Sequence, residues 1–491
     1  MRSRFLFGFS VPGNAWIGFG FVAALCGFFA ATPAWAQEPP PPEFLVAPDV
    51  GVQEAFTDNA FLTPTNPKDD FITSIFAGGT ASFETGRTNA HVTGKLYYDQ
   101  YAANPELSDW SVNADGNISY EVINDFLSIE GAGTATTTNV STFDTPAIDR
   151  TGTPGQILLS TYDIGPHIKT TLDDFADLDV FARLAQVGYG DTVDTTLPVP
   201  SDSTIFQTAA NLDTKTRYAG YQLITNAEYE KDDHGFQLYN VFQSAYISLI
   251  PGIRGIVRGG YDNVYDKNII DISAPLWSVG LEYTINDKSK ISVETGERYN
   301  HNAWAADLTL QISDKLYAIG RYYETLEPDQ AQVNNSFIDF IGAQTDLPTP
   351  LVPANFTVTG NLYNQPSLNK MGDFHLVYSW ERQALDVSFN WNDQQFIITP
   401  GHDRTLETSV SYRLQLAPDL SGDAEAYYTH TFASPVFGAN ETYNGTASLI
   451  YTINPTMNFT AGLAFQQQQE LFAGGVTIQE ADVFVAVSKN F

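Results

Sequence analysis

The feature that most constrains the fold is a repeated alternation of apolar and polar residues along most of the chain. Leu406–Leu416 places Leu, Thr, Val and Tyr on even positions and Glu, Ser, Arg and Gln on odd ones, and Trp277–Ile285 alternates in the same way. Successive side chains of a strand point to opposite faces, so such segments form strands with one apolar and one polar surface. No stretch after residue 36 approaches the roughly 18 apolar residues of a membrane-spanning helix.

The connections choose between a soluble sandwich, whose apolar faces point inward, and a membrane barrel, whose apolar face points to lipid. Short turns occur at Gly86-Arg87, Asn124-Asp125, Asp173-Asp174, Pro251-Gly252, Asp287-Lys288, Ser313-Asp314, Arg382-Gln383, Pro418-Asp419 and Asn454-Pro455. Longer connections occur at 59–69, 140–158, 190–202, 327–370 and 433–440. This asymmetry is typical of outer-membrane barrels, which have short periplasmic turns and long outer loops.

The predicted fold class is therefore all-β: a single transmembrane antiparallel up-and-down β-barrel of about 22 strands, within about 18 to 24, with no plug domain. The predicted domains are a cleaved signal peptide (1–36), a Pro-rich periplasmic lead (37–46) and a barrel (47–491) with a long outer loop at 327–370. A propeller or solenoid is the rival architecture, but the chain has no repeat of fixed period.

The first residues have the pattern of a secretory signal. Arg2 and Arg4 precede an apolar run that is densest over 17–30, and Ala34-Trp35-Ala36 is a small-x-small cleavage pattern. An uncleaved anchor is the alternative. The only cysteine, Cys26, lies within the predicted signal, so the mature chain is expected to have no disulfide and no thiolate metal site.

The charge of the chain bears on its partners. The sequence has 24 basic and 57 acidic residues, a formal net charge of −33. Such a charge repels nucleic acid. It suits an outer surface cross-linked to lipopolysaccharide by divalent cations, or a lumen that favours cations. Solubility of the loops is a further reason for the same charge.

The C-terminus is an amphipathic segment that ends on an aromatic residue. Ala481, Val483, Val485, Val487, Lys489 and Phe491 share one parity. A final strand closing on a terminal aromatic resembles the assembly signal of outer-membrane barrels, with Val485, Val487 and Phe491 as its residues. It implies the barrel-assembly machinery and outer-membrane lipid as partners.

Two stretches resemble a known family. They are Glu54–Phe61 followed by Asp70–Ile72, and Gly260–Tyr265 followed by Trp277–Leu281. These are similar to the second barrel-porin family of outer-membrane β-barrels, some members of which are associated with exosortase/PEP-CTERM and exopolysaccharide systems. Ala60 departs from the larger aliphatic residue expected there. The resemblance implies the location and the fold, with no catalytic residues and no substrate.

Motifs for catalysis or cofactors are not evident. The histidines are widely spaced, and neither an HExxH pair, a GxSxG elbow nor a Walker A loop occurs. His402-Asp403 is the one pair that suggests a rim enzyme, but Thr399–Asp403 is also rich in turn formers. We therefore expect no enzyme activity, no cofactor and no metal.

Ionisable residues on the polar parity are predicted to line the lumen, because an Arg or Lys facing lipid at mid-membrane costs about 2–4 kcal/mol. The candidates are Lys95, Arg183, Arg254, Arg258, Glu282, Asp307, Arg321, Glu407, Arg413, Glu425 and Asp482. They form either a pore field or pairs that fill the lumen, and the size of the barrel favours an open or partly open lumen. The loop 327–370 is expected either to narrow the mouth or to remain an exposed surface loop.

The predicted function is a passive diffusion channel for small hydrophilic solutes or ions across the outer membrane. The alternatives are an envelope component serving exopolysaccharide export or assembly, a structural barrel and, last, a rim enzyme. The sequence has no marker of the oligomeric state.

Overall fold

The computed structural model describes residues 43–139, 156–173, 175–190, 201–214, 220–267, 270–328, 330–335, 366–397, 401–433, 438–471 and 474–491. The predicted signal peptide, residues 1–36, lies outside these ranges, as does most of the long connection 327–370. Glu43–Val46, predicted from the sequence to belong to the Pro-rich lead, are the first residues of strand β1.

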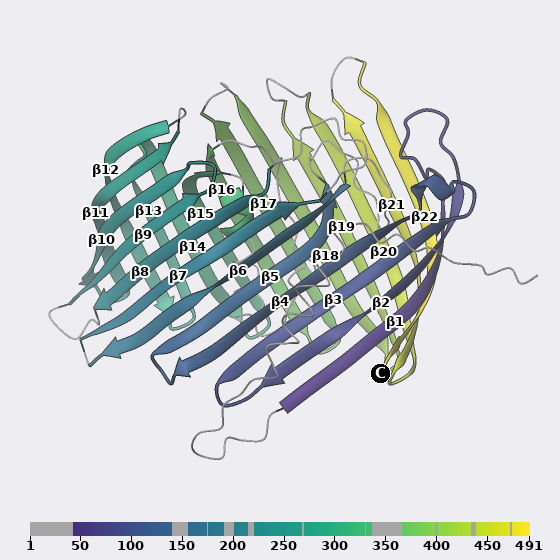
Figure 1. Ribbon diagram of the computed structural model, residues 1–491, viewed down its shortest axis with the longest axis horizontal. Helices are drawn as coiled ribbons and strands as arrows, with labels where there is room; N and C mark the ends of the chain where they lie inside the picture. Colours follow the sequence, from purple (N-terminus) through teal and green to yellow (C-terminus); the bar gives the residue numbers. More distant parts are fainter. Residues whose placement is uncertain are drawn as a thin grey trace, which may run out of the picture.

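The described residues fold almost entirely as strands, arranged side by side around one barrel (Figure 1). The strands are β1 (Glu43–Thr57), β2 (Asp70–Glu84), β3 (Thr88–Tyr101), β4 (Asp109–Ile123), β5 (Leu127–Asn139), β6 (Gln156–Leu172), β7 (Ala176–Tyr189), β8 (Ser203–Thr214), β9 (Tyr221–Asp232), β10 (Gln237–Ile250), β11 (Ile253–Asp266), β12 (Ile270–Asn286), β13 (Ser289–Arg298), β14 (His301–Ser313), β15 (Leu316–Pro328), β16 (Pro366–Trp380), β17 (Gln383–Phe396), β18 (His402–Ala417), β19 (Leu420–Thr431), β20 (Asn440–Asn454), β21 (Met457–Glu470) and β22 (Thr477–Asn490). One 3-10 turn, η1 (Pro105–Leu107), lies between β3 and β4.

The sheet closes on itself. Each strand pairs antiparallel with its neighbour in sequence, and β22 pairs antiparallel with β1 in a 22-stranded sheet. The closing register runs from Asp49 opposite Asn490 to Thr57 opposite Asp482. Where the chain finishes, the Phe491 N–H donates to the Pro48 carbonyl over 2.9 Å. The first and last strands therefore leave no open edge between them.

The two ends of the barrel differ. Short turns join β2 to β3, β10 to β11 and β12 to β13 at the end where the chain finishes, and the longer connections lie at the opposite end (Figure 1). We call these the turn end and the loop end. One loop-end connection is also tight: Tyr299 and Asn300, between β13 and β14, have φ of 52° and 62°. Two successive positive φ values define a type I′ hairpin turn, which explains how a short connection serves here.

The outer wall is apolar. On β12, the side chains of Trp277, Val279 and Leu281 are 48%, 47% and 57% exposed, whereas Glu282 on the other parity is 2% exposed. A soluble protein shows the opposite arrangement, with apolar residues buried. Such a wall is stable in lipid, and the alternation seen in the sequence is confirmed as an outward apolar and an inward polar face.

Two apolar clusters fill part of the interior near the loop end. One joins Phe236, Leu238, Val264, Tyr299 and Leu326 with neighbours from β12 and β16. The other joins β6, β7 and β8 to the segment 330–335, which is helical. Among the described residues, no helix is long and apolar enough to cross a membrane.

The segment 330–335 corrects the fold class expected from the sequence. The expectation of an up-and-down barrel of about 22 strands with no plug domain is wrong in its account of the interior, because it placed the loop 327–370 at the mouth or on the surface, whereas part of that loop packs inside the barrel. A barrel of 22 strands encloses more space than its inward side chains fill, and outer-membrane transporters of this size have a plugged lumen. Here Ala331 and Val333, 2% and 1% exposed, pack inside the barrel. The described residues show this insertion and no separate plug domain.

The lipid-facing wall makes a prediction about depth. Val279, near the middle of β12, and Ile285, at its turn end, are equally exposed at 47%. Val279→Arg is expected to lower the free energy of unfolding in lipid vesicles by about 2–4 kcal/mol, and Ile285→Arg by only about 0–1 kcal/mol. Urea titration followed by tryptophan fluorescence measures both. Equal costs would mean that the apolar band is not centred on Val279.

Candidate functional site on the inner wall

The predicted lumen residues lie on the strand face opposite to the exposed apolar side chains. They are Lys95 on β3, Arg183 on β7, Arg254 and Arg258 on β11, Glu282 on β12, Asp307 on β14, Arg321 on β15, Glu407 and Arg413 on β18, Glu425 on β19 and Asp482 on β22. Parity along each strand and the cross-strand registers place them all on the inner face. Whether they conduct or select a solute stays a prediction.

Three rows of polar side chains cross β11, and Arg254 is the centre of the row nearest the turn end. Its Nε donates to Glu282 Oε1 over 2.7 Å, and its Nη1 donates to Gln222 Oε1 over 2.8 Å. The second carboxylate oxygen of Glu282 is 3.5 Å from Lys290 Nζ. The guanidinium lies over the Tyr246 ring, 4.9 Å from its centroid. This row holds a nearly buried carboxylate between two cations, which offsets the cost of removing its charge from water.

Arg258 repeats the arrangement one step towards the loop end. Its Nη2 donates to Glu294 Oε1 over 3.1 Å, and its Nε donates to Ser244 Oγ over 3.0 Å. Ser278 Oγ donates to the other oxygen of Glu294 over 2.7 Å. The guanidinium lies over Phe242, 4.8 Å from the ring centroid. Both oxygens of Glu294 are therefore hydrogen-bonded.

A third row lies near the loop end. Arg298 Nε is 3.6 Å from Asp262 Oδ2, and the guanidinium is 4.6 Å from the Tyr299 ring centroid. Tyr299 lies in a connection outside the strands, and burial raises the pKa of its phenol because the phenolate would lose its hydration. Polar rows thus occur at three heights on this wall.

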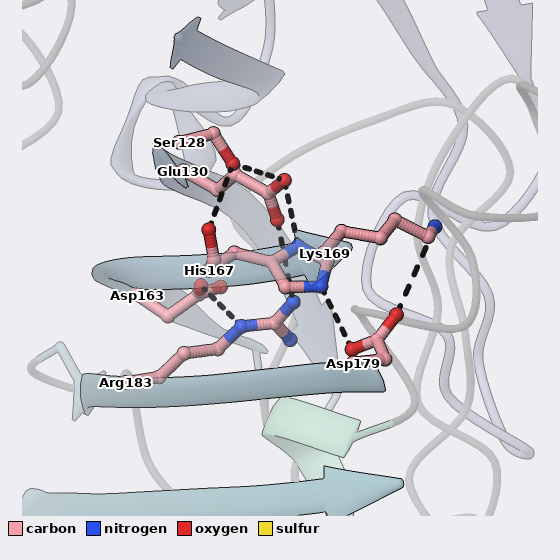
Figure 2. Close-up of polar contacts among 7 residues, drawn as sticks. All are labelled: Ser128, Glu130, Asp163, His167, Lys169, Asp179 and Arg183. Carbon is pink, nitrogen blue, oxygen red and sulfur yellow. Dashed lines mark hydrogen bonds and ion pairs between the residues drawn. The ribbon is translucent and has the colours of Figure 1, made fainter. Parts of the chain in front are cut away.

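A separate network joins β5, β6 and β7 (Figure 2). His167 Nδ1 lies 2.8 Å from Glu130 Oε1, and His167 Nε2 lies 2.8 Å from Asp179 Oδ1. Arg183 lies 3.8 Å from both Glu130 Oε2 and Asp163 Oδ1. An imidazole that donates from both nitrogens is the doubly protonated form. The network therefore alternates carboxylates with groups able to carry positive charge.

Lys95 reaches across a strand to its partner. Its Nζ is 3.1 Å from Asp49 on β1, although β2 lies between them. Gly78 is the β2 residue in that row, and a Cβ added there would lie 2.6 Å from Lys95 Cγ. The missing side chain of Gly78 is thus what lets Lys95 lie flat across β2.

The remaining predicted residues have weaker or more local contacts. Two of them are arginines with a carboxylate partner: Arg413 Nε donates to Asp423 Oδ1 over 2.9 Å, and Arg321 Nε is 3.5 Å from Asp373. Three are carboxylates that accept from a neutral side chain: Glu425 from Ser411 over 2.8 Å, Glu407 from Asn390 over 3.5 Å and Asp307 from Ser292 over 3.4 Å. Asp482 is buried opposite Thr57, where β22 meets β1. Of the predicted set, Arg254 and Glu282 form a hydrogen bond, and Asp307 and Arg321 are cross-strand partners of β14 and β15.

The segment 330–335 lies against this wall at the loop end. Ala331 and Val333 pack on Ile157, Leu159 and Ile205. Its polar side chains are also held: Thr161 Oγ1 donates to Asn334 over 3.2 Å, Gln207 Nε2 to Asn335 over 3.2 Å, and Asn335 Nδ2 to Glu327 over 2.8 Å. The segment thus follows β15 and meets the inner faces of β6, β7 and β8. Residues 336–365 of the same connection lie outside the described residues.

Several residues of these networks were missed from the sequence, above all Glu130, His167, Asp179 and Glu294. Each lies on the inward parity of its strand, a signal the sequence contains. What it does not contain is which residues of different strands share a row, because that depends on the register.

His402 and Asp403, the pair that suggested a rim enzyme, are the first two residues of β18 and do not point to the same side. Both residues belong to β18 and therefore point to opposite faces. His402 Nδ1 is 2.9 Å from Asp393 instead, and Asp403 is 4% exposed. Among the described residues, no three His, Cys, Asp or Glu side chains are grouped so that they could hold a metal ion.

The C-terminal residues take part in closing the barrel. Val485 and Val487 pair with Glu54 and Val52 of β1, and Phe491 is 63% exposed. Their proposed part in assembly stays a prediction.

Comparisons with known proteins bear on the fold. No family model and no curated protein matches the sequence, so the resemblance to the second barrel-porin family stays a prediction. Solved structures of similar fold include a ferric enterobactin receptor from Pseudomonas aeruginosa (10% identity, 91% of this chain, 80% of that chain, TM-score 0.44). They also include the siderophore receptor PirA from Acinetobacter baumannii (8%, 94%, 81%, 0.46) and the FrpB iron transporter from Neisseria meningitidis (11%, 90%, 81%, 0.49).

These neighbours are similar in fold alone. The closed sheet and its apolar outer wall place the protein in the outer membrane as a β-barrel, which confirms the predicted location.

The Arg258 row predicts an asymmetric effect on stability. Arg258→Met leaves Glu294, which is 8% exposed, without its cation, and is expected to lower the free energy of unfolding by about 1–3 kcal/mol. Adding Glu294→Gln is expected to recover part of that loss. The matched control is Arg413→Met, whose side chain is 65% exposed and whose loss should cost under about 1 kcal/mol. Urea titration measures all three, and equal costs at both arginines would contradict this account.

Proposed function

We propose that this outer-membrane barrel is a passive channel for small hydrophilic solutes or ions. The observation that carries the proposal is the inner wall of β11–β13, where Arg254, Arg258 and Arg298 form paired polar rows at successive heights. A hydrophilic solute leaves water only if the wall replaces its hydrogen bonds, and such rows offer donors and acceptors along the barrel. No cofactor or energy source enters this mechanism.

The segment 330–335 acts in this proposal as a narrowing of the channel at the loop end. Its apolar side chains are buried against β6–β8 and its amides are hydrogen-bonded there, so it is held at a defined place. A segment held at this place restricts passage by size. Such a narrowing is one of the two roles expected from the sequence for the loop 327–370, the other being an exposed surface loop.

A second candidate is uptake through a barrel that stays closed until a ligand and a partner open it. The number of strands favours it, because 22-stranded outer-membrane transporters have a plugged lumen. The two candidates differ in one measurable respect: a passive channel conducts by itself, whereas a closed receptor does not. A role in exopolysaccharide export and a structural role stay predictions.

Single-channel recording of the purified, refolded protein in a planar bilayer tests the proposal. We expect steady conductance, and a reversal potential under a KCl gradient that favours K⁺, because the chain carries a formal charge of −33. Silence from a protein that a heat-shift gel shows to be folded would overturn the passive channel and favour the closed receptor. A preference for Cl⁻ would show that the arginine rows, rather than the net charge, set the selectivity.

The narrowing is tested by releasing the segment from the wall. Val333→Asp places a carboxylate among Ile157, Leu159 and Ile205, where an unpaired charge is unstable, and is expected to free the segment and raise the single-channel conductance. Val476→Asp is the control, since Val476 is 38% exposed in the connection before β22. Unchanged conductance in folded Val333→Asp would rule out the narrowing.

A further inference from the structure

A hollow in the inner wall lies between the His167 network and the arginine rows. It encloses about 270 Å³ and is formed by β7, β8, β9 and β10. Ala209 on β8 forms its back. Phe181 on β7 and Phe242 on β10 border the space that the small Ala209 side chain leaves open. The volume is just below the range of about 300–1,000 Å³ of sites for drug-sized ligands. It suits a solute of single-ring size.

Polar groups around the hollow have hydrogen-bonding capacity to spare. Asn240 is 1% exposed and donates from Nδ2 to Glu228 over 2.9 Å, but its Oδ1 is buried with no partner among the described residues. Asn211 donates to Asn226 Oδ1 over 2.7 Å, which leaves the Asn226 amino group free within the same part of the chain. Because the Asn240 oxygen is closed off from solvent, the groups that a ligand in the hollow meets are the Glu228 carboxylate and the Asn226 amino group.

The charges around the hollow are balanced. Two carboxylates line the hollow, those of Asp179 and Glu228. Asp179 faces His167 at 2.8 Å and Lys169 at 3.8 Å, and Glu228 interacts electrostatically with Arg298. The two aromatic rings also carry cations: Arg183 lies 4.4 Å from the Phe181 centroid and Arg258 lies 4.8 Å from that of Phe242. A cation or an anion entering the hollow would meet charges of both signs. A neutral ligand would meet no net repulsion.

From these features we infer that the hollow binds a small neutral polyhydroxylated solute, a polyol or a monosaccharide. Hydroxyl groups both donate and accept, so they match the Glu228 carboxylate, which accepts, and the free Asn226 amino group, which donates. The C–H faces of such a solute pack against the edges of Phe181 and Phe242. The inference rests on the proposed function only in that the solute reaches the inner wall from the lumen.

Calorimetric titration of the full barrel in detergent micelles tests the inference, with glucose, sorbitol, guanidinium chloride and sodium acetate as probes. Glucose or sorbitol is expected to bind more tightly than either ion. If glucose is preferred, the hollow selects a ring, and if sorbitol is preferred, it selects an open chain. Both results support the inference. Tighter binding of guanidinium or acetate, or no binding of either neutral probe, would overturn it.

Two variants locate the binding. Ala209→Leu fills the back of the hollow and is expected to weaken binding of the neutral probe by about tenfold or more. Asn226→Ala leaves the space open but removes the free amino group, and is expected to weaken binding by about threefold to tenfold. Ala486→Leu is the matched control, because Ala486 lies on the inner face of β22, away from the hollow. Wild-type affinity in folded Ala209→Leu and Asn226→Ala would overturn the assignment.

The titration does not depend on ion flow, so its failure is distinguishable from that of the channel. A barrel that binds glucose but conducts nothing contradicts the passive channel and leaves this inference standing. A barrel that conducts but binds neither neutral probe contradicts this inference alone.

Discussion

The structure depends on the hydrogen bonds between β22 and β1. In hydrocarbon every backbone N–H and C=O needs a partner within the protein, and an open sheet would leave two unpaired edges. The pairing from Asp49–Asn490 to Thr57–Asp482 removes those edges. Side-chain contacts support it at the loop end, where Thr57 Oγ1 donates to Glu480 over 2.8 Å. Once the sheet is closed, each strand has one face towards lipid and one towards the interior, and the inward face carries all the chemistry described above.

Inside the barrel, polarity varies with height and with position around the wall. Towards the middle and the turn end, Arg254 and Arg258 hold Glu282 and Glu294 in ion pairs flanked by aromatic rings. Near the loop end, the apolar clusters around Leu326 and Val333 occupy the interior instead. The inserted segment 330–335 joins the two environments, since its apolar side chains complete one cluster while its amides bond to polar residues of the wall. The hollow behind Ala209 lies on the same wall.

Much of the wall was predictable because it follows from local pattern. The alternation over Trp277–Ile285 is enough to assign its apolar residues outward and Glu282 inward, and the short turns mark where strands reverse. The partners were not predictable in the same way. Glu130, His167 and Asp179 are separated by up to 49 positions, and they meet only because β5, β6 and β7 pair in one particular register. The pair His402-Asp403 shows the converse, since adjacency in sequence puts the two side chains on opposite faces of β18.

Local alternation, turn residues and the absence of long apolar runs already specify a strand-built outer-membrane barrel, because the period of a strand and the thickness of the bilayer act on short segments of chain. The occupancy of the interior is a different matter. That Ala331 and Val333 enter the barrel, that Lys95 crosses Gly78 to reach Asp49, and that Ala209 leaves a hollow are decided by the register and curvature of the closed sheet. These set distances between residues far apart in the chain, so they arise only once all the strands are in place.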